Sequence, residues 1–84
     1  MNFYSVYDLD LERYVSPFLA PSDAAAKAMV RDSLNPGSIL GQYPKKFDLV
    51  LIGTWDESKG ITGTNIKYIC NIASLVFSGG DGDD

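Results

Sequence analysis

Apolar and polar residues alternate near the start of the chain, in the pattern of β-strands. Residues 2–8 are rich in aromatic and β-branched side chains that fall on both sides of the alternation, which favours a strand. A second extended segment is indicated around residues 14–18. Pro17 in that segment is typical of an edge strand or of a strand end, because proline cannot donate a ladder hydrogen bond. We therefore expect two extended segments, the second of which lies at an edge of the sheet or ends near Pro17.

The longest apolar run, at residues 47–54, has a different pattern. After Asp48 both sets of alternate positions are mostly apolar, which is typical of a central strand that is covered on both faces. The charged segment that follows, residues 56–60, predicts a hairpin turn, in which Gly60 supplies a positive φ angle. The chain is expected to reverse direction there.

A helix is predicted at about residues 23–34. Ser22 is a suitable N-cap, and Asp23 matches the positive end of the helix dipole. The segment 35–37, Asn-Pro-Gly, ends the helix because proline disfavours α geometry in the residue before it. Apolar residues recur at helical spacing and predict the buried side of the helix: Ala26, Met29, Val30 and Leu34.

The segment 66–77 is ambiguous between strand and helix. Its residues 67–72 are rich in strand formers, and we favour a strand at about 66–72. The helical alternative depends on apolar residues that also recur at helical spacing: Ile66, Ile69, Cys70, Ala73, Val76 and Phe77.

These elements predict a small α+β fold. We expect a mostly antiparallel sheet of about four strands with one helix packed on a face. Residues 1–78 are expected to form a single domain, and residues 79–84, GGDGDD, a flexible acidic tail. Residues 38–46 are interpreted as a connection. A chain of 84 residues buries only about two thirds of its unfolded surface, so self-association would stabilise it.

Composition excludes several kinds of chemistry. The chain has no histidine and one cysteine, Cys70, so the usual zinc ligand sets and Ser–His or Cys–His nucleophile pairs cannot be built. We therefore expect no enzyme, no metal and no cofactor. No apolar run reaches the roughly 20 residues of a membrane span, and the N-terminal residues lack a signal-peptide pattern. We expect neither a membrane anchor nor export.

Charge is concentrated at the C-terminus. The formal net charge is −4, from seven basic and eleven acidic residues. Without Asp81, Asp83 and Asp84, seven basic and eight acidic residues remain, so the rest of the chain has a formal charge of −1. The acidity of the whole chain is therefore only a weak argument against nucleic-acid binding.

Two segments resemble motifs of the small nonstructural protein of gokushoviruses, single-stranded DNA phages of the microvirus family. The first is SPFLAPSDAAAKAM at residues 16–29, and the second is YPKKFDLVLIGTWDESKG at residues 43–60. An aromatic first strand that ends in VYD, residues 6–8, completes the resemblance, which spans nearly the whole chain. The second motif is the more specific: Pro44, Phe47, Leu49, Ile52, Gly53, Trp55 and Asp56 match it.

The resemblance implies a function. Proteins of this family are non-virion accessory proteins that are described as DNA-binding or as helpers of viral DNA replication and single-strand packaging. It implies single-stranded DNA or phage replication and procapsid proteins as partners, with the host cytoplasm as location. It supplies no catalytic residue. The alternative from another class is a protein–protein adaptor that binds the replication initiator or a capsid precursor and does not touch DNA.

Lys45 and Lys46 beside Tyr43 and Phe47 form the main candidate DNA site. Lysines neutralise phosphates, and aromatic faces stack on unpaired bases. In the alternative, the two aromatic residues belong to the core and the lysines only keep a strand end soluble.

Three further residues are candidates for DNA contact. Lys27 and Arg31 lie on the exposed side of the predicted helix and could add phosphate contacts, or they could form an ordinary solvated face. Trp55 could stack on a base or fill the core. The acidic tail could compete with DNA for the basic residues, or it could only add solubility.

Acidic residues near the first turn offer a weaker possibility. Asp8, Asp10 and Glu12 alternate there, but they lack the glycine and the closing glutamate of a calcium loop. We interpret them as a solvated edge rather than a metal site. Asp56 is expected to cap the turn that follows the long apolar run.

Overall fold

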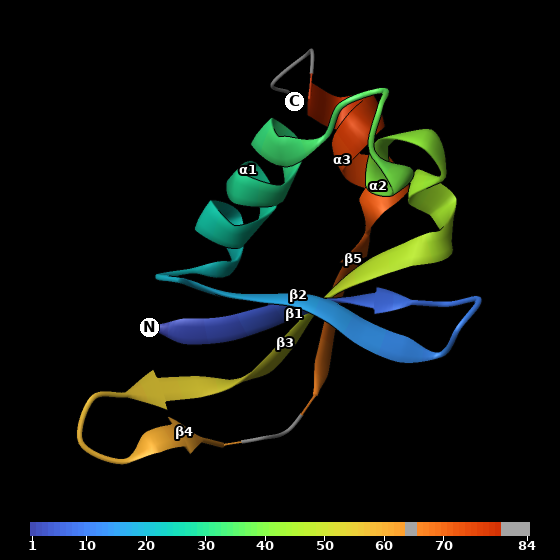
Figure 1. The fold of residues 1–84 in the computed structure, drawn as a ribbon. Helices are drawn as coiled ribbons and strands as arrows, with labels where there is room; N and C mark the ends of the chain where they lie inside the picture. Colours follow the sequence, from blue (N-terminus) through green and yellow to red (C-terminus); the bar gives the residue numbers. More distant parts are fainter. Residues whose placement is uncertain (64–65, 80–84) are drawn as a thin grey trace.

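A computed structural model describes residues 1–63 and 66–79 (Figure 1). Its central feature is an antiparallel sheet in which β1 (Asn2–Asp8) lies between β2 (Arg13–Ala20) and β3 (Phe47–Asp56). The other side of β3 pairs with two strands, β4 (Gly60–Thr62) at one end and β5 (Lys67–Asn71) at the other. The expected α+β fold with a mostly antiparallel sheet is confirmed. β2 is an edge strand, which is one of the two positions that Pro17 indicated.

Three helices lie on the same side of the sheet (Figure 1). They are α1 (Asp23–Ser33), α2 (Ile39–Gln42) and α3 (Ile72–Gly79), and a 3₁₀ turn, η1 (Pro44–Lys46), leads into β3. α1 begins as predicted, because the Ser22 side chain accepts a hydrogen bond of 3.1 Å from the backbone N–H of Ala25. Within residues 1–63 and 66–79, the sheet therefore has one face under helices and one face without them.

The buried core lies between the sheet and the helices. Tyr4 and Leu49 are completely buried, and they come from the two strands at the centre of the sheet. α1 contributes small and β-branched side chains, so it can approach the sheet closely. The buried members of this cluster are Tyr4, Val6, Ala20, Ala26, Val30, Phe47, Leu49, Ile72 and Leu75.

The structure differs from the predicted elements in three places. Residues 38–46 are not a simple connection, because Ser38 caps the short α2 and Pro44 begins η1. A fifth strand, β4, follows the predicted turn, in which Gly60 has the expected positive φ of 83°. The ambiguous segment is a strand and then a helix. Asn71 ends β5, and its side chain accepts a hydrogen bond from the N–H of Ala73 at 3.1 Å, which starts α3.

Strict alternation along β3 ends at Ile52. The pairing of β1 with β3 skips this residue: Tyr4 is opposite Leu51, and Phe3 is opposite Gly53. Such a bulge places an extra residue on one strand and shifts the facing of those beyond it. Gly53 therefore shares the face of Phe3. Strict alternation would instead place Gly53 on the same face as Leu51. The predicted acidic tail lies, from residue 80 onward, outside the described residues.

Candidate nucleic-acid interface

The structure brings three of the predicted DNA-contacting residues together at one end of β3. The short turn η1, with Tyr43 as its N-cap, holds three of these residues close together. We call this group the lysine corner: Tyr43, Lys45 and Lys46. The Tyr43 side chain is half exposed, and the Lys46 ammonium lies 5.2 Å from the centre of its ring. With Gln42 and Pro44 the corner surrounds a shallow hollow of about 340 Å³. Phe47, the fourth predicted member, is buried in the core.

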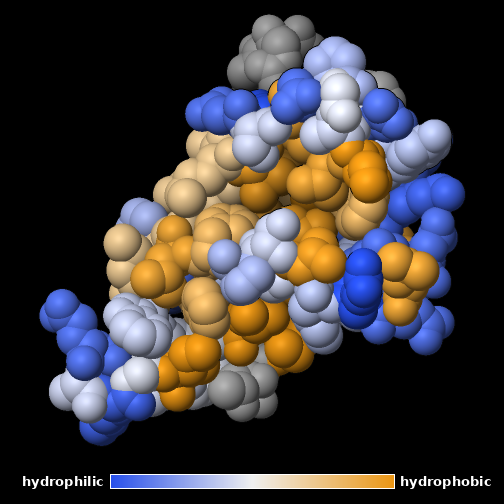
Figure 2. Space-filling view, in the orientation of Figure 1, coloured by the Kyte–Doolittle hydropathy of each residue, from blue (hydrophilic) through white to orange (hydrophobic). Residues whose placement is uncertain are grey.

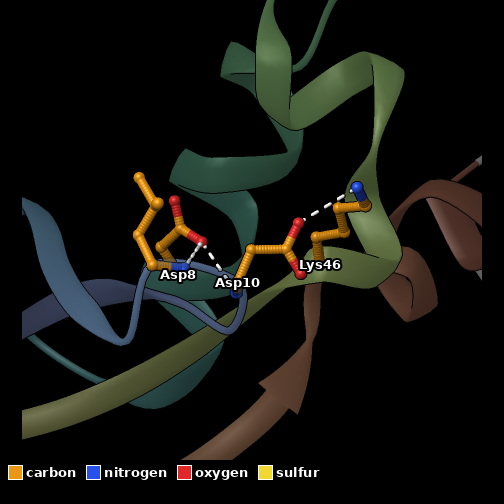
Figure 3. A network of polar contacts seen from close by, with 4 residues as sticks. Asp8, Asp10 and Lys46 are labelled. Atoms are coloured by element: carbon orange, nitrogen blue, oxygen red, sulfur yellow. Dashed lines mark hydrogen bonds and ion pairs between the residues drawn. The ribbon is translucent and has the colours of Figure 1, made fainter.

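Lys46 has a counter-charge from the turn between β1 and β2 (Figure 3). Its Nζ lies 3.0 Å from Oδ2 of Asp10. The Asp8 carboxylate holds this turn in place, because it accepts hydrogen bonds from the backbone N–H groups of Asp10 and Leu11 at 2.9 and 3.0 Å. The bond to Asp10 raises the pKa of Lys46, which stays charged but must leave this carboxylate to bind a phosphate.

Lys45 is in a different situation. No described carboxylate lies within 4.0 Å of its ammonium group. Its backbone carbonyl accepts a hydrogen bond of 3.1 Å from the Asn71 side chain, so its main chain is anchored while its exposed side chain points to solvent. Lys45 is therefore the member of the lysine corner that can meet a phosphate without breaking an ion pair.

The remaining predicted cations lie elsewhere. Lys27 and Arg31 are on α1, and α3 contacts both α1 and η1, so α3 separates them from the lysine corner (Figure 1). Arg31 lies 4.0 Å from Asp32, which is a weak surface contact. The Asp23 carboxylate, at the start of α1, lies 3.6 Å from the Lys67 ammonium group. It also accepts a hydrogen bond from the Tyr4 hydroxyl. Of the cations on this side, Arg31 and Lys67 each have a carboxylate within 4.0 Å.

Trp55 does not belong to the lysine corner. It lies eight residues beyond Phe47 along β3, about 26 Å away at the usual rise of a strand. Its side chain is 39% exposed and lies outside the buried core cluster, beside Met1 and Leu19. It is therefore not the core residue that one alternative predicted.

Sequence reasoning missed the role of Asp10. It was expected to be one of several solvated acids, and no local pattern links it to Lys46, 36 positions away. Among residues 1–63 and 66–79, no three His, Cys, Asp or Glu side chains gather closely enough to hold a metal ion. Asp56 does cap its turn, as expected: Oδ1 accepts hydrogen bonds from Ser58 and Lys59, which lower the pKa of Asp56.

Comparison with known protein families identifies the chain's relatives. Residues 1–75 match the family described as "Phage ORF5 protein". The chain belongs to this phage family. The match covers every described strand of the sheet together with α1, α2 and η1, and it ends within α3. No curated protein and no solved structure matches the chain. In the described part of this phage protein, no helix has the length and apolar character needed to cross a membrane.

Proposed function

We propose that this phage protein is a non-enzymatic accessory factor that assists viral DNA replication or single-strand packaging through weak, salt-dependent contact with DNA. The phage family supports a viral role, and the resemblance to gokushovirus nonstructural proteins supports the narrower one. The same resemblance supports a location in the host cytoplasm and absence from the virion. Mass spectrometry of purified virions tests the absence from the virion. Detection of the protein there in stoichiometric amounts would contradict it.

The observation that carries the DNA proposal is the lysine corner. Two lysines and an exposed tyrosine project together from one short turn, next to a shallow hollow. This combination can neutralise two phosphates and stack on one base. Lys45 offers its charge freely, while the Asp10 carboxylate competes for Lys46.

The same geometry limits the affinity. Two phosphate contacts on single-stranded DNA give a log–log salt slope of about −1.4. Lys27 and Arg31 could add two further contacts only if the strand also passed over α1, and four contacts would give about −3. The near-neutral body provides little long-range attraction. Binding by one protomer is therefore expected to be weak, and several protomers on one strand would strengthen it.

Charge changes at the lysine corner test the proposal. Lys45→Glu with Lys46→Glu is expected to weaken binding of a labelled single strand at least about tenfold at low salt, because two phosphate contacts become repulsive. Asp10→Asn is expected to strengthen binding about two- to fivefold, because Lys46 loses its competing carboxylate. Fluorescence anisotropy at two salt concentrations measures both effects.

Arg13→Glu with Lys59→Glu is the matched control. It makes the same change in net charge at exposed residues outside the lysine corner, so an equal loss of affinity would mean that binding depends on total charge alone. Absence of binding by the wild type at low salt would contradict the DNA proposal and favour the adaptor.

A protein–protein adaptor is the second candidate, and an apolar groove favours it. The groove lies between α1 and β2, where Figure 2 shows hydrophobic side chains gathered in the middle of the visible face. It has a volume of about 280 Å³, and its apolar lining includes Phe18, Met29, Val30 and Leu40. Met29 is 46% exposed, and flexible methionines adapt to varied apolar side chains. A replication initiator or capsid precursor could insert such a side chain here.

A further inference from the structure

Among the described residues helices cover one face of the sheet, and the other face is mostly aromatic and aliphatic, with Ser5 and Asp48 as its polar members. Cross-strand partners point to the same face, so the register shows which side chains face away from the helices. None of these outward residues belongs to the core cluster or packs against it. We call them the outer sheet face: Phe3, Tyr7, Tyr14, Leu19, Val50 and Tyr68.

Aromatic side chains dominate this face. Tyr7 and Tyr14 are opposite each other on β1 and β2, and their rings meet edge to face with centroids 4.8 Å apart. Tyr68 of β5 lies opposite Val50 of β3 and is 60% exposed, whereas Val50 is only 6% exposed. Rigid aromatic pairs of this kind lose little conformational entropy on association, so they are effective anchors in interfaces.

The outer sheet face carries no cation. All seven Lys and Arg residues fall within the described ranges, and none occupies an outward strand position. Lys67, the nearest, pairs with Leu51 and turns toward Asp23 on the helix side. Asp48 is the acid at the margin of the face, and the Asn71 side chain donates a hydrogen bond of 2.9 Å to it. Phosphates would find no partner here, so the charge pattern disfavours nucleic acid as the occupant.

We propose that a second copy of this chain covers the outer sheet face, so that two sheets pack in a symmetric sandwich. A cation-free surface of mostly aromatic and aliphatic side chains can pack on a copy of itself about a two-fold axis, with Asp48 at the margin of the contact. It also offers no charge complementarity to a different, charged partner. Val50 is already buried within one copy, so the second copy would mainly cover the exposed Tyr14 and Tyr68.

The size of the face sets the expected strength. Four strands about 4.8 Å apart and about seven residues long cover roughly 20 by 23 Å, or about 450 Å² on each copy. Stable complexes bury about 800 Å² on each partner. The dimer is therefore expected to be reversible, with a dissociation constant on the order of 1–100 μM. The lysine corner and α1 stay accessible, so a dimer would present two DNA-contacting groups to one strand.

Sedimentation of the full chain over a range of concentrations tests the proposal. The wild type is expected to pass from monomer to dimer in the micromolar range, with little dependence on salt. Tyr14→Glu with Tyr68→Glu is expected to weaken dimerisation at least about tenfold, because four carboxylates would then meet across the interface. Both tyrosines are at least half exposed, so the monomer is expected to fold, which circular dichroism checks.

Tyr43→Glu is the matched control, because Tyr43 is 52% exposed but lies in the lysine corner. It is expected to leave dimerisation unchanged. Hydrogen exchange supplies an independent reading: protection of β1, β2 and β5 is expected to rise with concentration. A monomer at all concentrations up to about 1 mM, or a dimer that survives both glutamates, overturns the proposal. Neither result bears on DNA binding by the lysine corner, which is measured separately by anisotropy.

Discussion

Leu49→Ala is expected to lower the free energy of unfolding by about 2–5 kcal/mol, the largest effect of any single change considered for this chain. Leu49 is completely buried at the centre of β3, where it is opposite Val6 of β1 and Cys70 of β5. Truncation leaves a cavity between two strands and the helices, and three elements must move to close it. Chemical denaturation followed by circular dichroism measures the loss.

The size of this effect depends on the small core. Domains have stabilities of about 5–15 kcal/mol, and short chains lie near the lower end, so Leu49→Ala is expected to leave part of the protein unfolded at 37 °C. Leu11→Ala is the matched control. Leu11 is 60% exposed in the turn after β1, and its truncation is expected to change stability by less than about 0.5 kcal/mol. Equal losses in the two variants would contradict the assigned core.

Tyr4→Phe is expected to lower the free energy of unfolding by about 1–2 kcal/mol at pH 7. The Tyr4 ring is completely buried, and its hydroxyl donates a hydrogen bond of 2.6 Å to Oδ1 of Asp23 and accepts one of 3.0 Å from Asn2. This bond joins the central strand to the first turn of α1. Because the Asp23 side chain is 40% exposed, water replaces part of the lost bond, so the estimate is at the lower end for charged partners.

The pH dependence gives a second reading of the same contact. The bond from Tyr4 lowers the pKa of Asp23 below its ordinary value of 3.8, and burial raises the pKa of Tyr4. A carboxylate whose pKa is lowered by folding stabilises the fold above its unfolded pKa, and this stability is lost as pH falls through the folded pKa. The difference between wild type and Tyr4→Phe is therefore expected to shrink as the pH falls below about 4.

Tyr43→Phe is the control for both readings, because the exposed Tyr43 hydroxyl makes no hydrogen bond within the described residues. It is expected to unfold like the wild type at every pH. A Tyr4→Phe variant that is as stable as the wild type at pH 7 would show that the contact with Asp23 contributes nothing.

Local patterns were sufficient for the elements that depend on neighbours in the sequence. The N-cap at Ser22 and the apolar spacing after it predicted α1 to within one residue at its end. Pro17 indicated an edge strand or a strand end, and Gly60 predicted the turn after β3. In each case the cause is a backbone or side-chain restriction within a few residues, so no distant contact could change the outcome.

Where two tendencies overlap in one segment, local patterns failed. The segment 66–77 has strand formers and a helical stripe, and Asn71 divides it into β5 and α3. Its side chain bonds both to Asp48 and to the Phe47 carbonyl, on a strand more than 20 residues earlier. The bulge at Ile52 has a similar cause, because it arises from the pairing of β3 with β1. Neither contact can be deduced from adjacent residues.

The candidate site divides in the same way. Residues adjacent in sequence, Tyr43, Lys45 and Lys46, stay together in the fold, as their spacing predicted. The sequence did not show that Asp10 would neutralise Lys46, nor that α3 would separate Lys27 and Arg31 from the lysine corner. Side chains on different elements meet only through the packing of those elements.

By itself, the sequence determined that this chain is a small α+β protein with an apolar central strand, because alternation, caps and turn residues act over short distances. Membership of the phage family rests instead on the match of residues 1–75. The tertiary structure alone decided which carboxylates reach the lysines and which face of the sheet lies under helices. The physical reason is that strand register and helix placement are global choices, which depend on contacts between residues far apart in the sequence.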